Sequence, residues 1–456
     1  INQILESRRE VKNIKILRKT GEALKEKSFE GLDWNFTSSV GYEDSEEVNL
    51  QAFKNEKDET LTYSLGMDKM FSSATTLSIK FDRQSRDSEL NPLISTNNPT
   101  FGNARTADKL TVNISQELWR NAFGANTRRK LNSGSLEERK ANFNSLEKLE
   151  DLTLEALKLY WDTFVAKESL KASLEAQKRF EKLTKTIGSK AKLGYSNPGE
   201  LNIPLAELEE KKQQVKIDSA KYLEKSRELF RMLQQPMPNE LNFTASTALA
   251  EPNNLPDYKI DELRKIEILN MDLVITENKL KNKVSENQPQ LQFVASAAYS
   301  GADTKPGEAW SEALSGDKPI YAVGLNLNLP LYSKFNRGSI KELNYNLEKN
   351  KIELNIEKEK LQNEINNLQD TVNANYLIAQ SYSKSYVYRK DAAVEIEKAF
   401  RQGRSDISIL VQTYNALSMT ETQKIKSIGD YHIALNQLAA TLDLLIKSEP
   451  TAKGEL

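Results

Sequence analysis

The fold of this chain is decided by a short stretch near its C-terminal end, FRQGRSDISIL at residues 400–410. It places a glycine and two polar residues inside a long run without proline. A glycine followed by Ser-Asp and a new apolar run is typical of one helix ending and another beginning. We predict that Gly403 ends the first helix and that Ser405 or Asp406 caps the second. The stretch is then the tip of an antiparallel helical hairpin.

A second stretch of the same kind, AKLGYSNPGEL, lies at residues 191–201. There Gly194 would end a helix, and Pro198 is a residue favoured in a first helical turn. The helices that lead to both tips are long, and leucines in one of them follow a strict seven-residue step from Leu347 to Leu368. Such heptads predict coiled-coil packing. We therefore expect two long helical hairpins.

Six other segments alternate apolar and polar residues with a period of two, which predicts half-buried β-strands. These segments begin at Leu32, Leu291 and Tyr321 or lie at 60–69, 75–84 and 110–118. A short turn joins 60–69 to 75–84, whereas residues 85–108 form a long polar connection that we expect at an outer surface. A soluble sheet and a membrane barrel with a polar lumen both fit this alternation.

The order helix, strands, long helix, turn, helix occurs twice, and we interpret it as an internal repeat in a mixed α+β protein. The predicted segments are a first ascending helix (1–31), first strands with outer loops (32–118), a first long hairpin with its tip near 194–201 (119–235), a connecting segment (236–256), a second ascending helix (257–288), second strands (289–331), a second long hairpin with its tip near 403–410 (332–447) and a tail (448–456).

Composition excludes several classes of function. The chain of 456 residues has a formal net charge of −1, one histidine and no cysteine. It therefore offers neither a basic surface for nucleic acid nor thiolates for disulfides or metal. His432 has no second ligand and is interpreted as structural. We find no nucleophile–base pair and no phosphate loop, and we expect no enzyme activity, no cofactor and no metal.

The chain opens directly in a helical pattern, INQILESRREVKNIKIL. From this we expect a processed or trimmed N-terminus. No apolar run approaches the length of a transmembrane helix, about 20 residues.

Six segments follow one another along nearly the whole chain. They are ELWRNAFGANTRR from Glu117, YWDTFVAKESLKASLEAQKRF from Tyr160, GYSNPGELNIPLAELE from Gly194, NQPQLQFVASAAYS from Asn287, VGLNLNLPLYSKFNRGSI from Val323 and GRSDISILVQTYNAL from Gly403. In this order they resemble the TolC-type family of outer-membrane efflux proteins. The pair 60–69 and 75–84 departs from the family's usual four strands, so four or six strands per chain remain open.

The resemblance implies a homotrimer in the bacterial outer membrane, whose three chains build one β-barrel and a periplasmic tunnel of antiparallel coiled-coil helices. Four or six strands are also too few for one chain to close a membrane barrel, which needs about eight. Such a trimer would be the exit duct of a tripartite efflux or secretion system. Its partners would be a periplasmic adaptor protein, an inner-membrane transporter and outer-membrane lipid, and no nucleic acid.

The resemblance also implies roles for two groups of residues. The tips would dock the adaptor through Gly194, Glu200, Leu201, Gly403, Ser405, Asp406, Ile407 and Leu410. Charges close to the second tip would form rings in a narrow pore and act as a gate; the candidates are Lys390, Asp391, Glu395, Glu397, Arg401 and Arg404. The alternative hypothesis is a soluble or surface trimeric coiled-coil scaffold without transport activity, which predicts no requirement for detergent.

Overall fold

The structure, a computed structural model, describes most of the chain. The described residues are 9–46, 57–89, 105–193, 199–238, 241, 243, 249–252, 257–317, 319–330 and 334–446. Gly194 and Pro198 of the first predicted tip lie outside them. The chain divides into two compact units. The sheet unit comprises Thr20–Lys140 and Asn270–Ile352, and the helical unit comprises Ile1–Lys19, Ala141–Leu269 and Glu353–Leu456.

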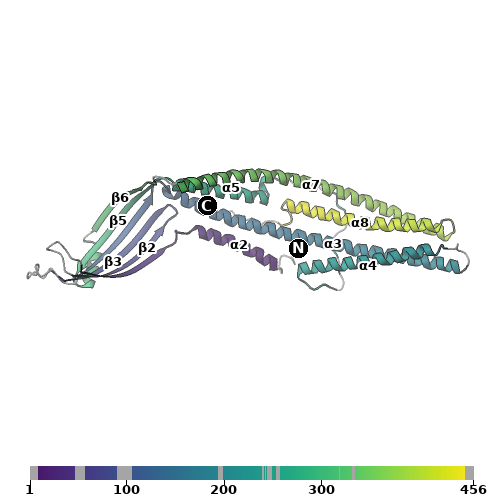
Figure 1. The fold of residues 1–456 in the computed structure, drawn as a ribbon, viewed down its shortest axis with the longest axis horizontal. Helices are drawn as coiled ribbons and strands as arrows, with labels where there is room; N and C mark the ends of the chain where they lie inside the picture. The colour runs from purple at the N-terminus through teal and green to yellow at the C-terminus, as the bar shows by residue number, and fades with distance from the viewer. Residues whose placement is uncertain are drawn as a thin grey trace, which may run out of the picture. The chain divides into compact units, whose positions relative to one another are not determined.

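Six strands form one antiparallel sheet in chain order (Figure 1). They are β1 (Asn35–Ser45), β2 (Lys57–Met70), β3 (Thr75–Glu89), β4 (Arg105–Glu117), β5 (Gln290–Asp303) and β6 (Pro319–Asn328). The extra pair predicted from the sequence is present, so the described chain contributes six strands rather than four. Within the described residues, β1 and β6 are the two edges of the sheet and each pairs on one side only.

The strand register gives the sheet one apolar and one polar face. A row of paired apolar residues crosses all six strands, namely Phe36, Met67, Ile79, Val112, Ala297 and Tyr321. Successive side chains along a strand point to opposite faces. The opposite face therefore carries the paired polar row Ser39, Ser64, Asp82, Lys109 and Ser300.

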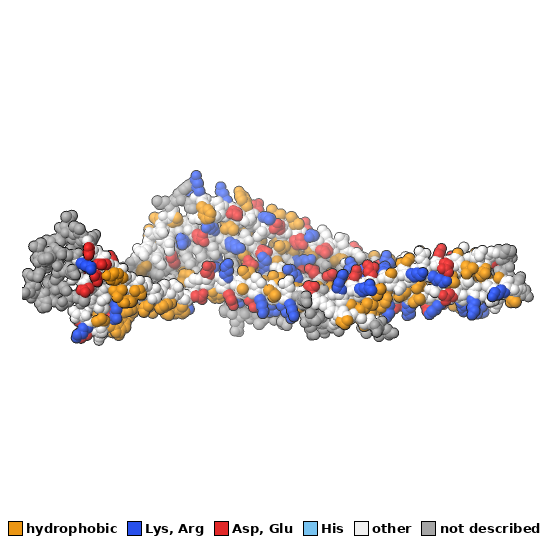
Figure 2. Space-filling model, turned by 60° about the horizontal axis from the view of Figure 1, so that its bottom comes forward, with side chains coloured by type: hydrophobic (Ala, Val, Ile, Leu, Met, Phe, Trp, Pro, Cys, Tyr) orange, Lys and Arg blue, Asp and Glu red, His pale blue; other side chains and the backbone are white. Residues whose placement is uncertain are grey.

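The apolar face is largely uncovered, and Figure 2 shows hydrophobic side chains gathered over the strands. Phe36 is 65% exposed, Val40 67% and Val323 73%. The predicted alternation is thus confirmed. The inner strands β2 and β5 are mostly half-buried, as predicted, whereas the edge strands β1 and β6 are exposed along almost their whole length. Alternation of apolar and polar residues predicts that the two faces of a sheet differ in polarity. It does not predict what covers the apolar face.

A short helix that the sequence did not predict, α6 (Pro306–Ser315), lies in the β5–β6 connection and packs on one end of the apolar face. Trp310 meets Phe81 edge-on with ring centroids 5.0 Å apart. Beside it, Arg83 donates two hydrogen bonds of 2.7 Å to the fully buried Asp108. The helix was missed because ten residues that begin with Pro-Gly are typical of a loop.

The remaining described elements are mostly long helices. They are α2 (Arg9–Ser28), α3 (Ala125–Lys192), α4 (Asn202–Leu233), α5 (Arg264–Glu286), α7 (Lys334–Arg401) and α8 (Ile407–Thr441), with short 3₁₀ turns η2 (Ala122–Gly124) and η3 (Ile260–Glu262). Helices α3 and α7 have 68 residues each. Figure 1 shows α4 running back along α3 and α8 running back along α7. Among the described residues, no helix combines the length and the apolar character needed to span a membrane.

The heptad pattern of α7 marks its buried face. Of the four leucines on the seven-residue step, Leu354 and Leu361 are buried and Leu347 and Leu368 are half-buried, which confirms that this face packs. The buried Val372 and Ala379 continue the same face. In the same unit His432 stacks on Trp161, with ring centroids 4.0 Å apart and planes inclined by 2°. Burial lowers the pKa of His432. This packing agrees with a structural role for the histidine.

Strands β2 and β3 are longer than the segments 60–69 and 75–84 predicted for them. Their polar ends continue the ladder, and the guanidinium of Arg86 pairs with the carboxylate of Asp58 across it. The sequence underestimated their length because the apolar alternation stops before the backbone pairing does. The connection expected over 85–108 is therefore strand at both ends, and residues 90–104 lie outside the described residues.

Gly301 provides a test of how α6 is seated. A Cβ atom at this position would overlap the backbone of Ala309 and Ala313, both fully buried in α6. We expect Gly301→Ala to displace α6, at a cost of about 1–3 kcal/mol, and to shift Trp310 fluorescence towards that of a solvated indole. Gly324→Ala is the matched control, because its Cβ would meet open space. Equal spectra for the two variants would contradict this packing.

Candidate functional site

The second hairpin tip has the two caps that the sequence predicts. Gly403 has a left-handed φ of 73°. Its N–H donates to the carbonyl of Phe400 at 3.1 Å, and the N–H of Arg404 donates to that of Ala399 at 2.9 Å. These two bonds form a Schellman motif, which ends α7. The next helix begins at Asp406, whose carboxylate accepts a 2.7 Å hydrogen bond from the N–H of Ser408. Of the two predicted caps, the structure selects Asp406.

The first tip is described only in part. Helix α3 ends at Lys192, and α4 begins at Asn202 without a side-chain cap. Gly199 is left-handed, with a φ of 89°. Glu200 and Leu201 are partly buried, whereas Gly194 lies outside the described residues.

Both tips share one hydrophobic core in the helical unit. Its members come from α3, α4, α7 and α8 and include Phe180, Leu183, Ile187, Leu208, Phe400, Ile407, Leu410 and Tyr414, with Leu201 packed against them. The side chains of Ile407 and Leu410 are therefore buried, and Leu410 is only 1% exposed. These two predicted docking residues do not present their side chains to a partner in the described chain. They instead pack in the core beneath the turn and so stabilise its conformation.

Sequence reasoning missed the apolar residues that are exposed around the tips. They are Leu193, Ile203, Leu205 and Ile409, each at least 40% exposed. Ile409 lies between the two buried residues Ile407 and Leu410, on the other side of α8. A helical wheel that places Ile407 and Leu410 on the buried side of α8 would have placed Ile409 on the exposed side. Exposed apolar side chains beside the exposed Gly403 and Asp406 make the tips a surface suited to binding another protein.

A network of charges joins three helices close to this tip. Glu397 of α7 accepts a 3.3 Å hydrogen bond from Lys182 of α3 and is paired with Arg401 of its own helix. Burial disfavours its charged form, but hydrogen bonds from Arg401, Tyr414 and Lys182 outweigh burial and lower the pKa of the Glu397 carboxyl. Burial and the bond to Glu397 raise the pKa of Tyr414.

A second link lies beside the first. Arg179 of α3 pairs with Glu421 of α8 at 3.5 Å and donates a 3.2 Å hydrogen bond to Ser418. Tyr386 of α7 donates to Glu421 at 3.4 Å. Helices α3, α7 and α8 are therefore connected by charged hydrogen bonds in addition to the apolar core.

The six predicted gate charges do not form one group. Glu397 and Arg401 belong to the network between helices, and Arg404 contacts Gln402 at the turn. Lys390, Asp391 and Glu395 are exposed on α7. Asp391 and Glu395 are four residues apart and so lie on the same side of the helix.

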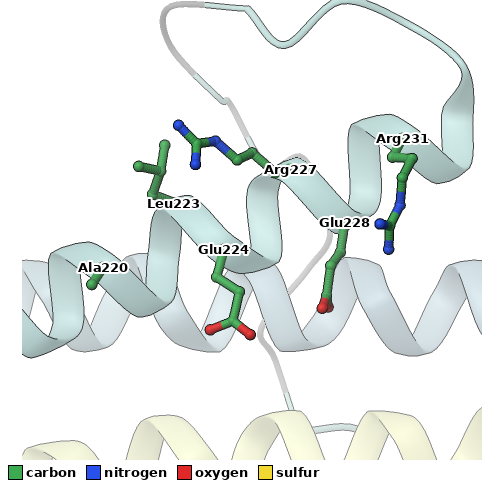
Figure 3. A pocket seen from close by; sticks show the side chains of 6 residues that line it. All are labelled: Ala220, Leu223, Glu224, Arg227, Glu228 and Arg231. Atoms are coloured by element: carbon green, nitrogen blue, oxygen red, sulfur yellow. The ribbon is translucent and has the colours of Figure 1, made fainter.

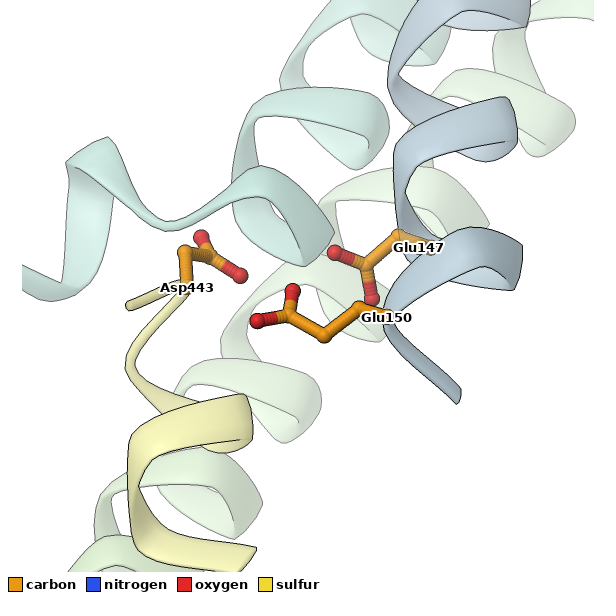
Figure 4. Close-up of side chains that lie close together, drawn as sticks. All are labelled: Glu147, Glu150 and Asp443. Carbon is orange, nitrogen blue, oxygen red and sulfur yellow. The ribbon is translucent and has the colours of Figure 1, made fainter. Parts of the chain in front are cut away.

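Three carboxylates converge elsewhere in the helical unit, as Figure 4 shows for Glu147, Glu150 and Asp443. The guanidinium of Arg264 pairs with all three, at 2.9 Å to Glu147 and 3.0 Å to Asp443. Burial raises the pKa of Glu147, and Arg264 opposes this shift. The oxygens that could hold a cation are thus engaged by arginine, which ties α3 and α5 to the end of α8.

A shallow depression runs along α4 (Figure 3). All six residues that line it come from this one helix, and they include Glu224, Arg227 and Arg231. A depression built on a single helix does not surround a small ligand. The depression and the exposed side chains of Ile217 and Leu223 together form a face of α4 on which another helix could pack.

Comparison with known proteins identifies the fold. No protein-family model matches the chain, and no curated protein sequence matches it. Solved structures do match over almost its full length. CusC, whose structures concern folding and transmembrane channel formation, aligns with a TM-score of 0.67 at 9% identity, covering 97% of this chain and 90% of that one.

Two further structures are similar. The outer membrane protein VceC of Vibrio cholerae gives a TM-score of 0.62 at 9% identity, covering 96% of this chain and 94% of that one. The MtrE outer membrane channel of Neisseria gonorrhoeae gives 0.64 at 12% identity, covering 97% and 87%. The chain therefore has the fold of TolC-type outer-membrane channels, as its sequence motifs predict.

The network around Glu397 predicts a pH-dependent stability. A carboxyl whose pKa is lowered by folding stabilises the protein above its unfolded-state pKa, and the effect disappears as the pH falls through the folded-state value, here below 4.5. We expect Glu397→Gln to lower the free energy of unfolding by about 1 kcal/mol at neutral pH. In acid the two proteins should converge. Glu395→Gln is the control, and a difference that does not change with pH would contradict the assignment.

Proposed function

We propose that this chain is one subunit of a trimeric exit duct in the bacterial outer membrane. The observation that carries the proposal is the uncovered apolar face of the six-stranded sheet, opposite a face rich in serine, threonine and charge. Such a sheet is stable in lipid with its apolar face outward and its polar face towards water. The fold shared with solved outer-membrane channels supports the same location.

The height of the apolar face suits a membrane. Along β6 and the residue that follows it, apolar residues run from Tyr321 to Leu329 at every second position. Nine residues at about 3.4 Å span roughly 30 Å along the strand, and a tilt of about 40° reduces this to about 23 Å. The lipid-facing band of membrane barrels is about 25 Å tall.

The two sheet edges require partners. In hydrocarbon, an unpaired backbone N–H or C=O costs several kcal/mol, so an open edge does not occur there. Strand β6 runs opposite to β1, and β6 of one copy can therefore pair antiparallel with β1 of the next. Three copies give eighteen strands, which leaves an aqueous lumen. The internal repeat interpreted from the sequence would give each copy two helical hairpins, and three copies would complete a ring of helices.

The helical hairpins would form the periplasmic tunnel and meet the adaptor at their tips. The open face of α4, with Ile217 and Leu223, would pack against a neighbouring copy. At the tips we assign docking to Gly403, Ser405, Asp406 and Ile409, and at the first tip to Gly194, Glu200, Leu201, Ile203 and Leu205. Ile407 and Leu410 would position the turn from beneath. An inner-membrane transporter would supply the substrate through the adaptor.

The charged network would hold the tunnel closed until the adaptor binds. Links from Lys182 to Glu397 and from Arg179 to Glu421 join α3 to α7 and α8. Rotation of α7 and α8 away from α3 would break both of these ion pairs. In a trimer the exposed carboxylates of Asp391 and Glu395 would recur three times, and a ring of negative charge in a pore favours cations.

Assembly is tested by mass. We expect the protein extracted in mild detergent to have three times the chain mass of 51.7 kDa, because only several chains can pair every edge. Light scattering with detergent correction measures this. A stable monomer would overturn the proposal, and a trimer that remains soluble without detergent would favour the scaffold hypothesis.

Docking is tested by two neighbouring residues with opposite burial. Ile409 is 49% exposed and Leu410 only 1%. We expect Ile409→Asp to keep normal trimer levels and lose adaptor cross-linking and export. Leu410→Asp should lower trimer levels, because it places a charge in the shared core. Gly403→Val should cost about 1 kcal/mol or more through its left-handed φ and also impair docking. Normal cross-linking by Ile409→Asp would remove the tips from the mechanism.

A further inference from the structure

The two edge strands of the sheet have nearly equal lengths. Strand β1 has 11 residues and β6 has 10, and both are exposed along almost the whole strand. Sheet edges that stay in water are commonly protected by charged side chains, prolines or bulges, which hinder pairing with another strand. Strand β6 carries no charged side chain, and its one proline, Pro319, is its first residue. The rest of its edge is therefore open to another strand.

Helix α6 limits the open edge on the β6 side. Strand β5 continues to Asp303, whereas its pairing with β6 ends at Tyr299 and Pro319. Beyond this point the N–H of Ala302 donates a 2.9 Å hydrogen bond to the carboxylate of Glu312 in α6. A side chain of the same copy thus replaces the missing partner strand. The open edge on this side is therefore β6 alone.

The two faces of the sheet limit which residue of a second β1 can lie opposite Tyr321. Tyr321 belongs to the apolar row that begins at Phe36 in its own copy. A shift by one residue would place apolar side chains on the polar face, so the partner lies at Phe36 or an even number of residues from it. The candidates further along β1 are Ser38, Val40, Tyr42 and Asp44.

Barrel closure excludes the candidates nearest to Phe36. Barrel strands tilt by about 35–45°, which requires a stagger, a displacement along the strands from one copy to the next. With six strand spacings of about 4.8 Å and about 3.4 Å per residue, a stagger of four residues gives a tilt of about 25°, six residues about 35° and eight residues about 43°. Val40 would give a stagger of four residues, so Tyr42 and Asp44 remain.

Strand length favours Tyr42 over Asp44. With Tyr42 opposite Tyr321, every residue of β6 lies opposite residues 35–44 of β1. With Asp44 in this position, Pro319 would lie beyond the end of β1. A carboxylate would also lie beside Tyr321 on the apolar face. The register at Tyr42 therefore leaves the smaller part of either edge unpaired.

We propose that β6 of one copy pairs with β1 of the next in the register that places Tyr321 opposite Tyr42. The large apolar pairs across this junction are then Tyr321 with Tyr42, Val323 with Val40, and Leu327 with Phe36. Such cross-strand pairs stabilise antiparallel sheets. The inference rests on the proposed function, because it requires copies of the chain to close one barrel. It adds the stagger of six residues per copy and a role for α6, which closes the end of each junction.

Disulfide formation can measure this register, because the sequence has no cysteine. Val323→Cys is combined in one chain with Ser38→Cys, Val40→Cys or Tyr42→Cys, which correspond to staggers of four, six and eight residues. The full-length protein is purified in mild detergent and oxidised. Within one copy β1 and β6 lie five strand spacings apart, about 24 Å, so a disulfide forms only between copies. Diagonal neighbours, about 7–8 Å apart, are too distant for a disulfide.

We expect Val323→Cys with Val40→Cys to yield covalent trimers, at three times 51.7 kDa on a non-reducing denaturing gel. The two diagonal combinations should yield about tenfold less. Directly opposite pairs alternate along the strands between a closer and a wider spacing. Gly324→Cys with Ser39→Cys tests the other spacing in the same register, and a Cβ atom at Gly324 meets open space. Chains with Val323→Cys alone are the control and should remain monomeric on the gel.

The outcomes separate failure of the register from failure of the proposed function. Strongest cross-linking with Ser38→Cys or Tyr42→Cys would overturn the register and leave the duct in place. The same holds if neither in-register pair cross-links in protein that has the mass of a trimer. Cross-linking by Val323→Cys alone would show that two β6 edges meet and would also overturn it. Protein with the mass of a monomer would instead contradict the proposed duct itself.

Discussion

The structure depends above all on the unmet hydrogen bonds at the two edges of an amphipathic sheet. Strands β1 and β6 carry backbone groups without partners among the described residues, and the face between them exposes large apolar side chains on every strand except β5. In water such a surface would associate, and in lipid its edges must be paired. In the proposed duct, association of chains would pair both edges of the sheet.

The helical unit is stabilised mainly by side-chain packing between long helices. Long helices with heptad stripes bury Leu354, Leu361 and Val372 along one face and leave the rest to solvent or to another helix. Specific contacts occur within this packing at several places. They are the turn at Gly403 and Asp406, the links of Glu397 to three helices, the stacking of His432 on Trp161, and the pairing of Arg264 with Glu147, Glu150 and Asp443.

Burial divides the residues near the tip into those exposed to solvent and those that fill the core. Ile409 and Leu410 are adjacent in sequence, yet one is exposed and the other fills the common core. Similarly, Glu397 is held by Lys182 and Arg401, whereas Glu395, two positions earlier, faces solvent. Residue type alone does not distinguish the members of either pair. The tryptophans show the same difference, since Trp34 and Trp119 in the sheet unit are exposed, whereas Trp161 in the helical unit is buried.

The sequence by itself determined the features that depend on local spacing. Period-two segments gave the strands, seven-residue steps gave the buried stripe of α7, and Gly403 with Asp406 gave the turn, because each reflects backbone geometry within a few residues. Tertiary structure alone decided the rest. The pairing of Arg86 with Asp58 extended β2 and β3 beyond their apolar pattern, and α6 formed where a loop was expected, because it packs on Phe81 and Gly301. The three-helix contacts of Glu397 and the pairing of Arg264 with Glu147, Glu150 and Asp443 bring together residues that are distant in the chain. No local pattern encodes such contacts, since they exist only after the chain has folded.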